Sequence, residues 1–155
     1  MDAVLSAVVA VAGTLLGSIA TYVFQRSFAE RQERASRAER YRAERLAVYT
    51  EFAAAATDLR RAAYDRWHRY QEQPESDAFT AARDEYYRVY AEARNAQLKL
   101  RLLTGDQELV QLAHDAVERA TEIKDAGTEP ERAERGVRAK DALDAFVATA
   151  SAQLR

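Results

Sequence analysis

The sequence feature that most constrains the fold is an uncharged stretch near the start of the chain, from Ala3 to Phe24. Its 22 residues rise about 33 Å as an α-helix, enough to cross a hydrocarbon core of about 30 Å. A helix is expected there, because lipid offers no hydrogen-bond partner to an open backbone. We therefore predict that residues 1–24 form a transmembrane anchor.

The flanking charges predict the orientation of this anchor. Seven arginines lie between Arg26 and Arg45, whereas the N-terminal side offers only Asp2 and the α-amine. The positive-inside rule then predicts a single pass through the cell membrane, with the N-terminus outside and the C-terminal domain in the cytoplasm. A cleaved signal peptide is the alternative. It fits poorly, because there is no basic segment before the apolar stretch and charges occupy the expected cleavage region.

Small residues recur every four positions within the apolar stretch, at Gly13, Gly17 and Thr21. They share one helix face, and the GxxxG spacing allows two backbones to approach closely and pack. This face predicts self-association into a homo-oligomer. The alternative is that these glycines have no such role, since glycine is common in membrane helices.

Residues 25–45 are predicted to continue the same helix as a charged stalk. No proline or glycine occurs between Gly17 and Pro74, and Glu30/Arg34 and Glu33/Arg37 are spaced to pair along a helix. At about 1.5 Å per residue this segment would hold the following domain about 30 Å from the bilayer. Its arginines could bind anionic lipid head groups, but the interleaved glutamates favour a solvated face.

Residues 46–155 are predicted to form a cytoplasmic bundle of helices, because apolar residues recur there at steps of three and four. A first helix ends near Pro74, and further helices span residues 77–103, 107–126 and 128–153. Gly105 and Gly127 are expected to end helices in the left-handed conformation. Thr128 and Glu131 form a capping box. Short connections make successive helices antiparallel, so the expected fold is all-α with an up-down bundle.

The same periodicity predicts which side chains face the core. In the first helix they are Tyr49, Phe52, Ala56, Leu59, Ala63, Trp67 and Tyr70. In the second they are Phe79, Ala82, Tyr86, Val89, Tyr90, Ala93, Leu100 and Leu103. In the third they are Leu109, Leu112, Ala116, Ala120 and Ile123, and in the fourth Val137, Leu143, Phe146, Val147 and Ala150. Gly136 weakens the prediction for the start of the fourth helix, because glycine costs about 1 kcal/mol there.

No residue pattern points to catalysis or to a cofactor. The chain has no cysteine and two histidines, His68 and His114. Asp65 and His68 share a helix face, but a carboxylate metal centre in a bundle needs matching motifs on further helices. No phosphate-binding loop or nucleophile elbow is present. We expect a non-enzymatic protein without metal or cofactor, and the net charge of −2 argues against nucleic acid as a partner.

One segment combines aromatic residues with arginines and is the candidate partner-binding surface. Its members are Arg60, Arg61, Tyr64, Arg66, Trp67, His68, Arg69 and Tyr70. Arginine and large aromatic residues are enriched in the hot spots of protein interfaces. The same residues could instead be core aromatics on which guanidinium groups stack. The sequence leaves both interpretations open.

Several runs resemble the KilB-like membrane proteins of Streptomyces and related actinomycetes. They are Ala7–Gly17, Thr21–Arg26, Glu44–Tyr49 and Asp65–His68, and the similarity extends over the Gly105 turn and residues 138–150. KilB proteins are associated with the spread of conjugative plasmids between mycelial compartments, and their uncontrolled expression harms the host. The resemblance implies a membrane-associated role in plasmid transfer and supplies no catalytic residue.

The leading functional hypothesis is therefore a membrane-anchored interaction protein that presents a helical docking surface to other proteins. The alternative is a small membrane-perturbing protein of holin or toxin type, which would oligomerise through Gly13 and Gly17. Leakage of a dye from vesicles caused by the transmembrane peptide alone would favour this alternative.

Overall fold

The computed structural model describes the backbone of residues 2–154, and the side chains of Gln32 and of residues 36–154. The chain is folded into four α-helices and a short 3-10 turn, and residues 2–154 contain no strand. The elements are α1 (Asp2–Glu72), α2 (Asp77–Leu103), α3 (Gln107–Glu122), η1 (Ile123–Asp125) and α4 (Glu129–Gln153). The predicted all-α fold is confirmed.

The chain divides into two compact units, residues 1–43 and residues 44–155. The first unit contains the segment predicted to span a membrane, with its packing residues Gly13, Gly17 and Thr21. The side chains of that segment lie outside those that the structure describes. Among the residues that are described, no helix is both long and apolar enough to cross a bilayer. The transmembrane anchor therefore stays a prediction.

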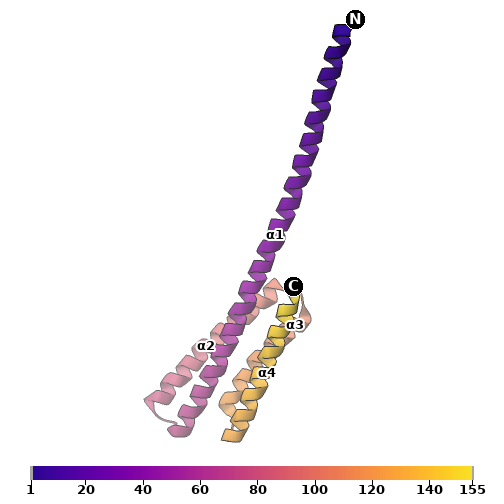
Figure 1. Cartoon of the computed structure of the whole chain (residues 1–155). Coiled ribbons are helices and arrows are strands. Elements are labelled where there is room, and N and C mark those ends of the chain that lie inside the picture. Colours follow the sequence, from indigo (N-terminus) through magenta and orange to yellow (C-terminus); the bar gives the residue numbers. More distant parts are fainter. Residues whose placement is uncertain (1, 155) are drawn as a thin grey trace. The chain divides into compact units, whose positions relative to one another are not determined.

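The second unit is a bundle formed by the C-terminal part of α1 together with α2, α3 and α4. Successive helices run in opposite directions (Figure 1), as the short connections predicted. The largest fully buried side chains are Phe52, Leu59, Leu100, Leu109, Val117, Ile123 and Phe146. The rings of Phe52 and Phe146 meet edge to face with centroids 4.6 Å apart, which fastens α1 to α4.

Side-chain caps define where the helices of the bundle begin. The Ser76 hydroxyl accepts from the first turn of α2, and the Asp106 carboxylate accepts from two backbone N–H groups of α3. At α4, the Thr128 hydroxyl accepts from the backbone N–H of Glu131, whose carboxylate accepts from Gly127 N–H at 2.8 Å. The predicted capping box is therefore present, with its glutamate bonded one residue before the capping threonine.

The predicted helix ends need two corrections. Gly105 and Gly127 do not adopt the left-handed conformation, since no glycine in the described chain has a positive φ. Thr104 ends α2 instead: it turns extended, with φ −115 and ψ 137, and its N–H bonds to the Leu100 carbonyl. The third helix stops at Glu122 rather than Ala126, because the last residues tighten into η1.

The core face of α4 was also partly misassigned. Val137 and Val147 are 59% and 42% exposed, whereas the small residues Gly136 and Ala139 are buried. A Cβ at position 136 would overlap the Tyr64 hydroxyl of α1. The hydropathy pattern selected the larger residues, but close packing of α4 against α1 requires the small ones.

Smaller corrections concern the rims of α1 and α2. Tyr70, predicted to face the core, is exposed, and Phe79, Tyr90 and Leu103 are only half-buried. Tyr70 and Phe79 lie against each other across the turn that joins the two helices, with ring centroids 5.5 Å apart. Both rings therefore form the edge of the bundle rather than its centre.

Candidate partner-binding site

Trp67, the centre of the segment predicted to bind a partner, belongs to the interior of the bundle. It is buried, and its indole Nε1–H donates to the Ala126 carbonyl oxygen at 2.7 Å. This bond satisfies the only polar atom of the indole and ties the end of α1 to the residue that follows η1. In this structure the indole is used for packing between helices.

Tyr64 lies beside Trp67 and packs against α4. The guanidinium of Arg132 is placed over both rings, 4.8 Å from the centroid of Tyr64 and 5.3 Å from that of Trp67. Arg132 also forms an ion pair with Glu129, which lowers the pKa of that carboxyl through their hydrogen bond. Two of the predicted surface residues thus hold α1 against α4.

Four other members of the segment face outward: Arg61, His68, Arg69 and Tyr70. Arg61 pairs with Asp58 at 3.3 Å, and Arg69 pairs with Glu72 at 3.0 Å and with Asp65 at 3.6 Å. These partners come from the same helix, at the spacing that stabilises a solvated face. Half-buried Arg60 has no carboxylate partner within the described chain.

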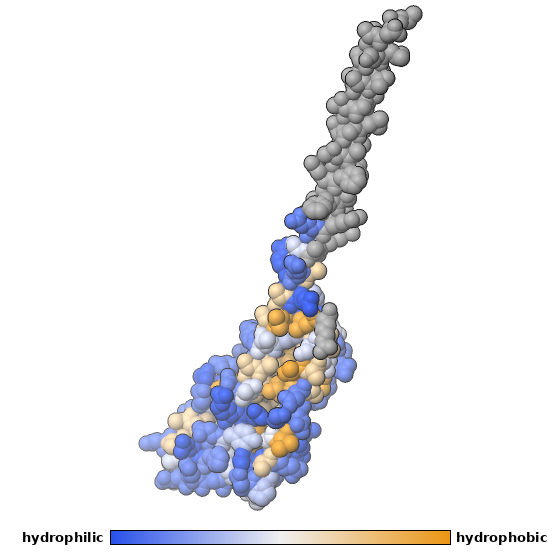
Figure 2. Space-filling view, viewed as in Figure 1, coloured by the Kyte–Doolittle hydropathy of each residue, from blue (hydrophilic) through white to orange (hydrophobic). Residues whose placement is uncertain are grey.

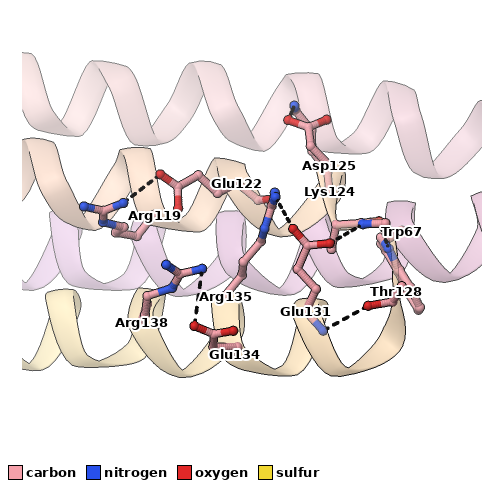
Figure 3. Close-up of polar contacts among 12 residues, drawn as sticks. Trp67, Arg119, Glu122, Lys124, Asp125, Thr128, Glu131, Glu134, Arg135 and Arg138 are labelled. Carbon is pink, nitrogen blue, oxygen red and sulfur yellow. Dashed lines mark hydrogen bonds and ion pairs between the residues drawn. The ribbon is translucent and has the colours of Figure 1, made fainter.

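Most arginines of the bundle surface are likewise paired with a carboxylate three or four residues away. The pairs include Arg88–Glu85, Arg88–Glu92, Arg119–Glu122, Arg135–Glu131 and Arg138–Glu134, the last three on α3 and α4 (Figure 3). The backbone N–H of Gly127 and the guanidinium of Arg135 hold the pKa of Glu131 below its usual range. These faces are neutralised locally and offer little net charge to a partner.

A groove between α2 and α3 differs from those faces. Its volume is about 370 Å³, and it is lined by Arg94, Gln97, Leu98, Arg101, Gln107, Val110, Gln111 and His114. No carboxylate belongs to this lining. We call it the α2–α3 groove.

The two arginines of the α2–α3 groove have no ion pair in the part of the chain that the structure describes. Arg94 donates to the side-chain oxygen of Gln97 at 2.7 Å, a neutral acceptor on its own helix. Leu98 is 52% exposed, and Leu102, one turn further along α2, is 89% exposed. Positive charge and exposed leucine therefore occur together along one side of α2.

The sequence carries a signal for this groove outside the Trp67 segment. Between Glu92 and Asp106 there is no acidic residue, although Arg94, Lys99 and Arg101 lie in that interval. Neither groove arginine has an acid three or four positions away, so neither can form an ion pair along its own helix.

Hydrophilic side chains cover most of the bundle surface seen in Figure 2, with hydrophobic patches between them. The two histidines lie on separate helices, His68 on α1 and His114 on α3. Across the described residues, no group of three histidine or carboxylate side chains is placed to hold a metal ion. The structure thus brings together no metal-ligand set at the Asp65–His68 pair.

A family model described as KilB plasmid transfer protein matches residues 46–154, a range that includes the Trp67 segment and the α2–α3 groove. No curated protein and no solved structure matches the chain.

Proposed function

Since the chain belongs to the KilB plasmid transfer protein family, we propose that it serves plasmid transfer as a non-enzymatic, membrane-anchored interaction protein. Family membership supports the role in plasmid transfer. The matched residues make up the helical bundle, which supports assigning that role to the bundle.

The proposed anchor is the uncharged segment 3–24, whose length suits a bilayer. The arginines that follow it favour a cytoplasmic bundle and an external N-terminus. Gly13, Gly17 and Thr21 would allow two such anchors to pack side by side. Anchoring would concentrate the bundle at the membrane.

The observation that carries the interaction role is the α2–α3 groove. Arg94 and Arg101 have no carboxylate of their own there, and Leu98 and Leu102 expose apolar surface beside them. A surface with this chemistry suits an amphipathic helix of a partner protein, with leucine-like residues on one side and aspartate or glutamate at its edge. We propose that such an acidic helix is the occupant.

Reversing the charge of the groove tests this role. Arg94→Glu combined with Arg101→Glu should reduce the frequency of plasmid transfer at least tenfold, because like charges would then face the acidic partner. The control reverses Arg83 on α2 and Arg119 on α3, which already pair with Asp84 and Glu122. Unchanged transfer in the groove variant, with the protein present at normal level, would contradict the proposal.

The anchor is tested separately by cell fractionation and a reporter. The full chain should sediment with membranes and resist an alkaline wash, and a chain lacking residues 2–24 should be released. A reporter fused after Arg155 should be active only in the cytoplasm. Release of the full-length chain from membranes by the alkaline wash would contradict anchoring. The groove experiment would remain valid in that case.

A further inference from the structure

A second cavity lies at the opposite end of α2 from the α2–α3 groove, where α1 ends and η1 turns. Its volume is about 320 Å³, and it is lined by Arg66, Tyr70, Phe79, Lys124, Asp125 and Ala126. Three elements, α1, α2 and η1, therefore contribute to one pocket. We call it the Arg66 pocket.

Arg66 is held in this pocket by aromatic rings. Its guanidinium is 5.0 Å from the ring centroid of Tyr86 and 5.5 Å from that of Tyr87, both on α2. The helical neighbours of Arg66 at three and four positions are Ala62, Ala63, Arg69 and Tyr70. Since none of them is acidic, Arg66 cannot be neutralised along its own helix.

One nitrogen of this guanidinium has no hydrogen-bond partner. Arg66 Nη1 is buried, and within the described residues nothing accepts a hydrogen bond from it. An arginine cannot relieve such burial by losing its proton. A buried charged donor without an acceptor is costly, and the neighbouring rings offset only part of that cost. Among the described residues, Arg66 also has no carboxylate in an ion pair.

Lys124 supplies a second cation in the Arg66 pocket. Its ammonium group lies 5.9 Å from the Tyr86 ring, on which Arg66 also stacks, and it pairs with Asp125. With one carboxylate against two cations, the lining has a local charge of +1. A singly charged anion would neutralise it.

The other walls of the pocket are apolar. Tyr70 and Phe79 place their rings 5.5 Å apart at its edge, and Tyr70 is exposed. A ligand could therefore present a charged group to Arg66 and an apolar part to these rings. A carboxylate can accept from the guanidinium N–H groups of Arg66 that line the pocket.

We propose that the Arg66 pocket binds a small molecule that carries a carboxylate next to an aromatic or other apolar group. Arg66 holds the carboxylate, Lys124 adds attraction, and Tyr70 and Phe79 pack against the apolar part. This site is separate from the α2–α3 groove. Its ligand would therefore be a different molecule from the partner protein that docks in the groove.

Benzoate is the probe, because it combines a carboxylate with one aromatic ring. The full chain in neutral detergent is titrated while the arginine Nε–Hε signals are followed by NMR, with chloride holding the ionic strength constant. Saturable binding at one site is expected, with a Kd of about 1 mM for so small a ligand, and the Arg66 signal should move most. No saturable shift, or tighter binding of inorganic phosphate than of benzoate, would overturn the proposal.

Variants separate a binding role of Arg66 from a packing role. Arg66→Met keeps the apolar stem and should abolish benzoate binding, and Lys124→Gln should weaken it several-fold. The control is Arg69→Met on the same helix, where the exposed arginine is already paired with Glu72, and binding should be unchanged. If Arg66→Met does not fold, Lys124→Gln decides, and benzoate binding equal to that of the unchanged chain would overturn the proposal.

Discussion

The region around Trp67 and the α2–α3 groove use arginine in opposite ways. At Trp67, Arg132 lies over two rings and pairs with Glu129. The positive charge of Arg132 is therefore neutralised by a residue of the same bundle. In the groove, Arg94 and Arg101 lack carboxylate partners in the described chain, and leucines beside them are exposed. Residues of the same types are therefore structural in one region and available to a partner in the other.

The difference can be traced to the local sequence. Arg132 follows Glu129 by three positions, whereas no acid lies three or four positions from Arg94 or Arg101. A helical ion pair contributes only a few tenths of a kcal/mol, so its absence costs the fold little. The absence of an ion pair does change the electrostatic potential at the surface, because the positive charge of an unpaired guanidinium can attract an anionic group of a partner.

The largest expected effect is the loss of the Trp67 side chain. Trp67→Ala removes a buried ring and its hydrogen bond to Ala126, and should lower the free energy of unfolding of the bundle by about 3–5 kcal/mol. Leu98→Ala in the groove is the comparison, and should change it by less than about 1 kcal/mol because Leu98 is half exposed. Urea unfolding followed by circular dichroism measures both. Equal losses would mean that the two regions do not differ as described.

The next effect concerns Gly136, where α4 approaches Tyr64. In an open helix, Gly→Ala gains about 1 kcal/mol, but the added Cβ here overlaps the Tyr64 hydroxyl. Gly136→Ala should therefore destabilise the bundle by about 1–3 kcal/mol.

Gly105→Ala is the matched control for that substitution. Nothing lies within 4 Å of its added Cβ, and its φ is not positive. This variant should be neutral or slightly stabilising in the same urea unfolding experiment. A stabilised Gly136→Ala protein would show that α4 does not pack on Tyr64 in this way.

A smaller effect should appear at alkaline pH. Burial raises the pKa of Tyr86 above its usual value near 10, chiefly by desolvating the phenolate. The folded state then holds its proton more tightly than the unfolded state does. The stabilisation is fully present below about pH 10 and is lost as the pH rises further. Tyr86→Phe should flatten the fall in melting temperature above pH 10, and an identical slope would contradict this origin.

The sequence predicted the order and the starts of the helices well, because breaks and N-terminal caps are local, whereas two of the predicted C-terminal ends were wrong. The break at Pro74 separates α1 from α2, and the capping-box spacing of Thr128 and Glu131 marks the start of α4. Which residues face the core was harder to predict. Val137 and Val147 are more hydrophobic than Gly136, yet only a glycine fits beneath Tyr64.

The candidate site was predicted only in part for a related reason. The Trp67 segment was recognised by composition, but whether the indole faces the core depends on Ala126, which lies 59 positions away. The α2–α3 groove depends on how two helices pack against each other, which no local pattern contains. The one local sign of this groove in the sequence is the interval from residue 93 to residue 105, which contains no acidic residue.

The most direct test of the central claim is site-specific photo-crosslinking from the groove in cells that are transferring a plasmid. A photoreactive residue in place of Leu98 should yield one dominant adduct with a protein whose crosslinked segment is an acidic helix. That adduct should disappear when Arg94 and Arg101 are replaced by glutamate. The same photoreactive residue in place of Val147, also exposed, should not give it. An adduct that forms equally from both positions, or that survives the charge reversal, would contradict the account.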